Sequence, residues 1–94
     1  MNREQEIRLN NVSTHLENAC KEILLGDEPL TRRVEIASME LELLRADDLD
    51  ALPEGLQSEA RQLIKLASNE ITQDTAVQYA SRLLDVYVKA ENVH

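Results

Sequence analysis

Apolar residues recur at alternating intervals of three and four along four separate segments of this 94-residue chain. Because an α-helix turns once every 3.6 residues, this spacing puts apolar side chains on one face of a helix. The segments predict helices near residues 4–25, 28–46, 53–69 and 73–91. Their apolar stripes are Leu9, Val12, Leu16, Ala19 and Ile23; Leu30, Val34, Ala37, Leu41 and Leu44; Leu56, Ala60, Leu63 and Ala67; and Ala76, Ala80, Leu83, Tyr87 and Ala90.

Residues that favour helix ends stand beside these stripes. Gly26 is placed for a left-handed C-cap of the first helix. The segment 27–29 supplies an acidic cap with a proline in the first turn, Pro53 opens the third helix, and Thr72 is an N-cap for the fourth. The start of the first helix stays open between residue 4 and His15, because Thr14 with Glu17 forms a capping-box pair.

The connections between the predicted helices are short, at residues 26–27, 47–52 and 70–72. Short connections make each helix turn back beside its predecessor. The expected fold is therefore all-α, an up-down-up-down four-helix bundle in a single domain over residues 1–94, with 1–10 and 92–94 as the ends expected to fray. Two glycines and two prolines are too few for the turns of a β-sandwich or barrel.

The helix predicted over 28–46 has a second apolar stripe. At 100° per residue, Ile36, Met39 and Leu43 fall on the side opposite Leu30 and its stripe. Either this helix is central and packed on both sides by its own chain, or the second stripe meets another chain, and we expect the latter, with a homodimer as the simplest case. A milder excess on the last helix, at Val77, Leu84 and Val88, is interpreted as core.

Composition and charge exclude several classes of function. The net charge is −8, aromatic residues make up 2% of the chain, and no basic run exceeds Arg32-Arg33, so direct nucleic-acid binding is not expected. No apolar stretch is long enough for a membrane span, and no export or anchoring motif opens the sequence. Cys20 is the one cysteine, which excludes an intrachain disulfide, and the expected location is cytoplasmic.

The acidity is concentrated between residues 27 and 55, where nine acidic residues face three basic ones. Four of the acids, Asp47, Asp48, Asp50 and Glu54, follow the second helix. They do not form an EF-hand, because counting from Asp48 the fifth position is Leu52 and the sixth Pro53. They are interpreted first as solvated helix caps. The alternative is a docking surface for a basic partner, as in an acidic inhibitor, an immunity protein or a nucleic-acid mimic.

Reactive side chains are few. His15 and Cys20 are about 140° apart around one helix, so they cannot form one nucleophilic site, and Cys20 is expected in the core. A phospho-accepting His15 is the enzymatic alternative. Histidine phosphotransfer domains are similar to the predicted bundle in architecture only, because their histidine is soon followed by a lysine and a glycine, whereas Leu16 to Ala19 follow here.

These observations favour a non-enzymatic helical protein–protein interaction module with no cofactor and no metal. It would bind a partner protein, of basic character in the acidic-docking alternative, or a second copy of itself, and it would bind neither nucleic acid nor membrane. The predicted contact residues are Ile36, Met39, Leu43, Glu40, Asp47, Asp48, Asp50 and Glu54.

Overall fold

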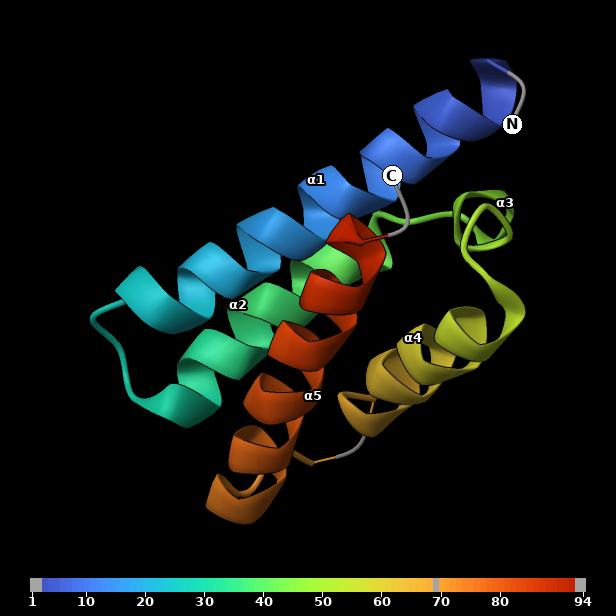
Figure 1. Ribbon diagram of the computed structural model, residues 1–94. Helices are drawn as coiled ribbons and strands as arrows, with labels where there is room; N and C mark the ends of the chain where they lie inside the picture. The colour runs from blue at the N-terminus through green and yellow to red at the C-terminus, as the bar shows by residue number, and fades with distance from the viewer. Residues whose placement is uncertain (1–2, 69, 93–94) are drawn as a thin grey trace.

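The computed structural model describes residues 3–68 and 70–92, and in those ranges the regular secondary structure is helical, with no strand (Figure 1). The helices are α1 (Arg3–Leu25), α2 (Leu30–Glu42), α3 (Ala46–Leu49), α4 (Glu54–Leu66) and α5 (Gln73–Glu91). The all-α prediction and its four long helices are confirmed. Over the described residues, no helix is both long and apolar enough to cross a membrane.

The four long helices alternate in direction, as the up-down-up-down prediction requires (Figure 1). α1 packs against α2, and α4 packs against α5. α5 joins the two hairpins, because it also packs against α1 and α2, whereas α4 touches α2 only lightly. α3 is one turn of helix that packs against α1 near its N-terminus. The molecule is elongated, with extents of 41 × 22 × 20 Å.

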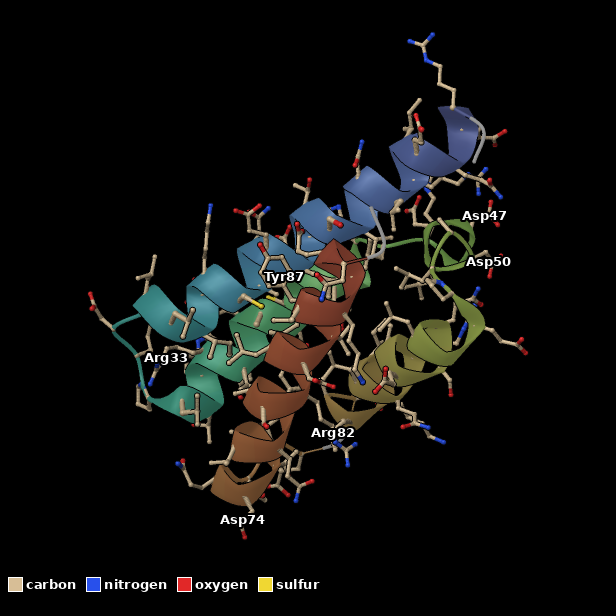
Figure 2. All side chains as sticks on the ribbon, viewed as in Figure 1. Arg33, Asp47, Asp50, Asp74, Arg82 and Tyr87 are labelled. Carbon is tan, nitrogen blue, oxygen red and sulfur yellow. The ribbon has the colours of Figure 1, made fainter. Side chains whose placement is uncertain are left out.

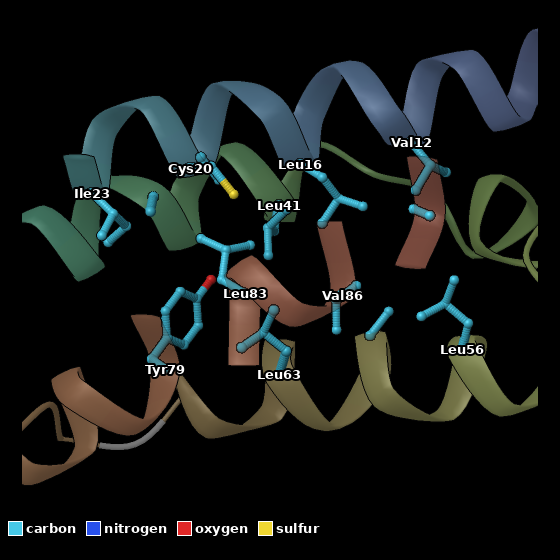
Figure 3. Close-up of a cluster of buried hydrophobic side chains, with 14 of the residues drawn as sticks. Val12, Leu16, Cys20, Ile23, Leu41, Leu56, Leu63, Tyr79, Leu83 and Val86 are labelled. Carbon is cyan, nitrogen blue, oxygen red and sulfur yellow. The ribbon is translucent and has the colours of Figure 1, made fainter. Parts of the chain in front are cut away.

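The core is aliphatic apart from Cys20 and one tyrosine, and every long helix contributes residues of its predicted stripe to it (Figure 3). All five stripe residues of α1 are buried, and Cys20 is buried with them. The helical period thus identifies the buried face of α1 in full. The buried residues of the other long helices are Val34, Ala37 and Leu41; Leu56, Ala60 and Leu63; and Ala76, Tyr79, Leu83, Val86 and Ala90.

The buried face of α5 is rotated from the predicted one. Tyr79 and Val86 are fully covered, whereas Val77 and Val88 are 52% and 57% exposed. The interpretation of Val77 and Val88 as core is therefore wrong, and Leu84 is only partly buried. The physical reason is the position of α5 between the α1–α2 hairpin and α4, which covers its two inner flanks and leaves the outer one open.

The turn between α1 and α2 is held by Arg33, whose Nη1 donates to the carbonyl of Ile23 (2.6 Å) and whose Nε donates to that of Glu28 (2.7 Å). Gly26 does not adopt a left-handed conformation, so the predicted C-cap is wrong. Gly26 is needed for close approach instead: a Cβ there would lie 2.7 Å from the carbonyl oxygen of Glu22 and 2.8 Å from the Arg33 side chain.

The helix boundaries differ from prediction at several ends. α1 begins at Arg3, so a start at His15 is wrong. α2 begins at Leu30 with Pro29 as its N-cap and no side-chain cap, which corrects the predicted acidic cap. α4 likewise follows Pro53 and is shorter than predicted. The N-cap at Thr72 is confirmed, because its hydroxyl accepts from the Thr75 N–H at 3.2 Å.

α2 ends four residues earlier than predicted, at Glu42, and the chain then forms α3. This departure buries Leu49 and Leu52, which are 5% and 3% exposed. A continuous helix would carry these leucines away from the bundle along its axis, so their burial favours the break. Asp47 and Asp48 consequently lie inside α3 and do not end α2.

Candidate functional site

The outward face of α2, which we define as Ile36, Met39 and Leu43, is only partly covered by the described residues. Met39 is 56% exposed and Leu43 is 65% exposed, while Ile36 is partly buried. At 100° per residue, Met39 and Leu43 each lie about 160° around the helix from Leu41, which is buried in the core. The alternative that the chain itself packs both sides of this helix is therefore wrong for these two residues.

An open groove of about 490 Å³ runs beside this face. We call it the α2 groove. Its lining residues are Glu35, Ser38, Met39 and Glu42 from α2, and Ala67, Glu70 and Ile71 from the connection between α4 and α5. Met39 belongs to both surfaces, so the groove and the outward face are continuous. None of the described lining residues is basic, and three are glutamates.

Glu40, a predicted contact residue, is engaged within the chain. Its Oε1 accepts hydrogen bonds from His15 Nδ1 at 2.7 Å and from Asn18 at 3.2 Å, both on α1. Burial acts to raise the pKa of Glu40, but the two hydrogen bonds outweigh it and hold the pKa below its usual value. Glu40 therefore joins α2 to α1 and borders the outward face on the side away from the groove.

Asp48 has a structural role at the start of α3. Its Oδ2 accepts from the backbone N–H of Arg45 at 3.1 Å and from the Asn11 side-chain amide at 3.1 Å. The first bond is the reciprocal half of a capping box, in which the third helical residue satisfies the N–H of the cap. Asp48 thus caps α3, a helix that the sequence did not predict, and not the end of the second predicted helix.

Asp47 and Asp50 lie at the end of the molecule opposite Arg33 and the α1–α2 turn (Figure 2). Asp47 lies 3.6 Å from the Arg8 guanidinium, and Asp50 lies 3.0 Å from that of Arg61. The side chains of Asp47 and Asp50 remain 71% and 61% exposed. Asp50 pairs with α4 through this bridge and does not cap it.

Glu54 is exposed in the first turn of α4, where a negative charge suits the helix dipole. Seen together, the eight predicted contact residues do not form one surface. Ile36, Met39 and Leu43 share the outward face of α2, and Glu40 borders it. The remaining four lie in the segment 47–54 beyond the end of α2, which we call the α3 region; they are Asp47, Asp48, Asp50 and Glu54.

The nucleophilic side chains are enclosed. The His15 side chain is 18% exposed and held by Glu40, and Cys20 is 4% exposed. Burial, with a smaller contribution from Glu17, raises the pKa of the Cys20 thiol to about 11, so the reactive thiolate is scarce at neutral pH. Within the part of the chain that the structure describes, no group of three metal-ligating side chains occurs.

The hydroxyl of Tyr79 is also enclosed, in the core below Cys20 (Figure 3). It has no hydrogen-bond partner among the described residues. Burial raises the pKa of this phenol, and Cys20 and Glu42 add to the effect. Because an unpaired buried hydroxyl is unfavourable, the stabilising contribution of Tyr79 comes from the packing of its ring and not from its hydroxyl.

No family model, curated protein or solved structure matches this chain. The geometry is therefore the basis for a functional assignment. Sequence reasoning found the outward face of α2 through its second apolar stripe. It missed the α2 groove, because Glu70 and Ile71 are about thirty residues from α2 and carry no motif that points to it.

Proposed function

We propose that this chain is a non-enzymatic protein–protein interaction module and that its outward α2 face is the partner contact. The observation that carries the proposal is the exposure of Met39 and Leu43, at 56% and 65%, on a helix whose opposite side forms the core. Neighbouring exposed apolar side chains on a small protein are typical of interaction sites.

The energetic argument favours a covered state. Fully burying a leucine or methionine side chain contributes about 1.5–3 kcal/mol. More than half of the surface of Met39 and of Leu43 is still exposed, so more than half of this contribution is left for contact with a partner. Met39 is also flexible and polarisable, which suits a binding surface that must adapt to a second molecule.

The acidic-inhibitor alternative has less support. In its proposed surface, the 47–54 segment, three of the four carboxylates already contact the same chain, at the backbone N–H of Arg45 and the guanidinium groups of Arg8 and Arg61. A partner would have to displace or share these contacts. The phosphocarrier alternative also has less support, because His15 is mostly covered and its Nδ1 is bound to Glu40.

Site-specific photo-crosslinking in the native cell tests the proposal. A benzophenone amino acid replaces Leu43, and Val88 is the matched control because it is similarly exposed, on α5. We expect a crosslinked product from position 43 and not from position 88. Its mass identifies either a second copy of the chain or a different protein. The absence of a product at position 43, or equal products at both positions, would overturn the proposal.

A further inference from the structure

The apolar residues of the outward α2 face have the spacing needed to pack along a second helix. Ile36, Met39 and Leu43 recur at intervals of three and four and extend about 10 Å along the axis. A partner helix with apolar residues at the same intervals can align with this stripe. The stripe alone does not identify the partner, because any amphipathic helix could contact it.

The α2 groove supplies the selectivity. Glu42 and Glu70 line it from opposite sides, and Glu35 extends the acidic border toward the start of α2. Glu35 has a neighbour of its own, since Arg32 Nη1 donates to it at 2.9 Å. The side-chain carboxylates of Glu42 and Glu70 make no hydrogen bond or ion pair within the described residues. A cation entering the groove would therefore meet carboxylates that are free to pair.

The same charges disfavour a second copy of this chain. A symmetric interface brings each surface patch against its own copy. An α2-to-α2 contact would therefore place Glu35 and Glu42 near the corresponding carboxylates, and the 27–55 segment already has nine acidic against three basic residues. Like charges across an interface oppose association. The charge pattern therefore favours a partner of opposite sign.

On the basis of the proposed function, we infer that the partner is a basic amphipathic helix, which sets its apolar residues on Ile36, Met39 and Leu43 and its lysines or arginines in the α2 groove. Apolar burial gives the affinity and the carboxylates select the partner's charge. Since both contacts are made along one side of α2, the α3 region takes no part.

The test uses an 18-residue peptide of leucine and lysine with helical apolar spacing. One control peptide has the same composition in an order without that spacing, and another has glutamate in place of lysine. Chemical-shift mapping on the isotopically labelled chain locates binding, and fluorescence anisotropy at 50 mM and 500 mM NaCl measures affinity. We expect the first peptide to bind best, to shift residues of α2 and the α4–α5 connection, and to bind more weakly at high salt.

Two matched charge reversals test whether the peptide binds in the α2 groove or at the 47–54 segment. Glu70→Lys alters the groove and Glu54→Lys alters the α3–α4 region by the same charge, and both residues are exposed. We expect Glu70→Lys to weaken peptide binding by about tenfold and Glu54→Lys by less than about threefold. Circular dichroism confirms that each variant is folded.

Equal binding of the three peptides, or shifts confined to residues 47–54, would overturn the inference. Its failure is distinguishable from failure of the proposed function. If position 43 crosslinks to a second copy or to a protein without a basic helix, the function holds and the stated partner is wrong. If position 43 gives no crosslink, the function itself fails.

Discussion

The outward face of α2, with the acidic α2 groove beside it, and the α3 region are adjacent in sequence, but they differ in what their side chains already contact. Around α3, carboxylates bind a backbone N–H and two guanidinium groups of the same chain. On α2, Met39 and Leu43 are mostly uncovered. Charge density alone therefore does not identify an interaction surface. What distinguishes the two regions is whether the fold has already used the side chains.

The largest test compares two leucines of one segment. Leu41→Ala removes a side chain that is 2% exposed and should destabilise the chain by about 2–5 kcal/mol. Leu43→Ala removes one that is 65% exposed and should change stability by less than about 0.5 kcal/mol. Urea denaturation measures both. Similar losses would mean that Leu43 is packed within the chain and that the outward face is not free.

A second test concerns the structural use of acids near α3. Asp48→Ala removes the acceptor for the Arg45 N–H and the Asn11 amide, and we expect a loss of about 1–2 kcal/mol. Asp47→Ala is the matched control, because its contact with Arg8 is longer and exposed, and a loss of less than about 0.5 kcal/mol is expected. Equal losses in urea denaturation would contradict the capping role of Asp48.

A third test asks whether Asp50 is bound by its own chain. A double-mutant cycle with Asp50→Asn and Arg61→Gln should give a favourable coupling of about 0.2–1 kcal/mol, the usual range for an exposed ion pair. The coupling should shrink in 1 M NaCl. If Asp50→Asn instead stabilises the chain and the coupling is absent, the carboxylate is repelled by its neighbours and available to a partner.

The smallest effect is expected at Glu40, which borders the outward face. Its folded pKa is below the usual value, so its contribution to stability is present above that value, about 4.3, and is lost as pH falls through the folded pKa. The difference in urea midpoint between the native chain and Glu40→Gln should therefore shrink between pH 5 and pH 2. A constant difference would show that its bonds to His15 and Asn18 contribute no pH-dependent stability.

The long helices follow from the sequence because their period is local. The α1 stripe from Leu9 to Ile23 is buried throughout, since one face of that helix meets the whole bundle. α5 was less predictable, because its apolar residues extend over more than half its circumference and the positions of α1 and α4 decide that Tyr79 is buried and Val88 is not. The positions of α1 and α4 cannot be predicted from the local spacing of apolar residues in α5.

The contacts of the 47–54 carboxylates and the lining of the α2 groove could not be predicted either, because they too depend on how distant segments pack together. Asn11 reaches Asp48 across 37 residues of sequence, and Glu70 reaches α2 only through the packing of α4 and α5. The break after Glu42 lacks a glycine or proline, and the burial of Leu49 and Leu52 that favours it depends on the rest of the fold. The second apolar stripe of α2, in contrast, could be recognised from the sequence. A surface helix needs one apolar face toward the core, so apolar residues on the opposite side indicate a further contact.

Cysteine labelling in the native cell tests the central claim, that the outward face of α2 is covered by a partner, most directly. Leu43→Cys and Val88→Cys place thiols at exposed positions on α2 and α5, and the native Cys20 should stay unlabelled because it is buried and its pKa is about 11. In the purified chain at low concentration, a maleimide should label both positions at similar rates. In the cell, we predict that position 43 is protected and position 88 is not. Equal labelling of the two positions in the cell would contradict the claim.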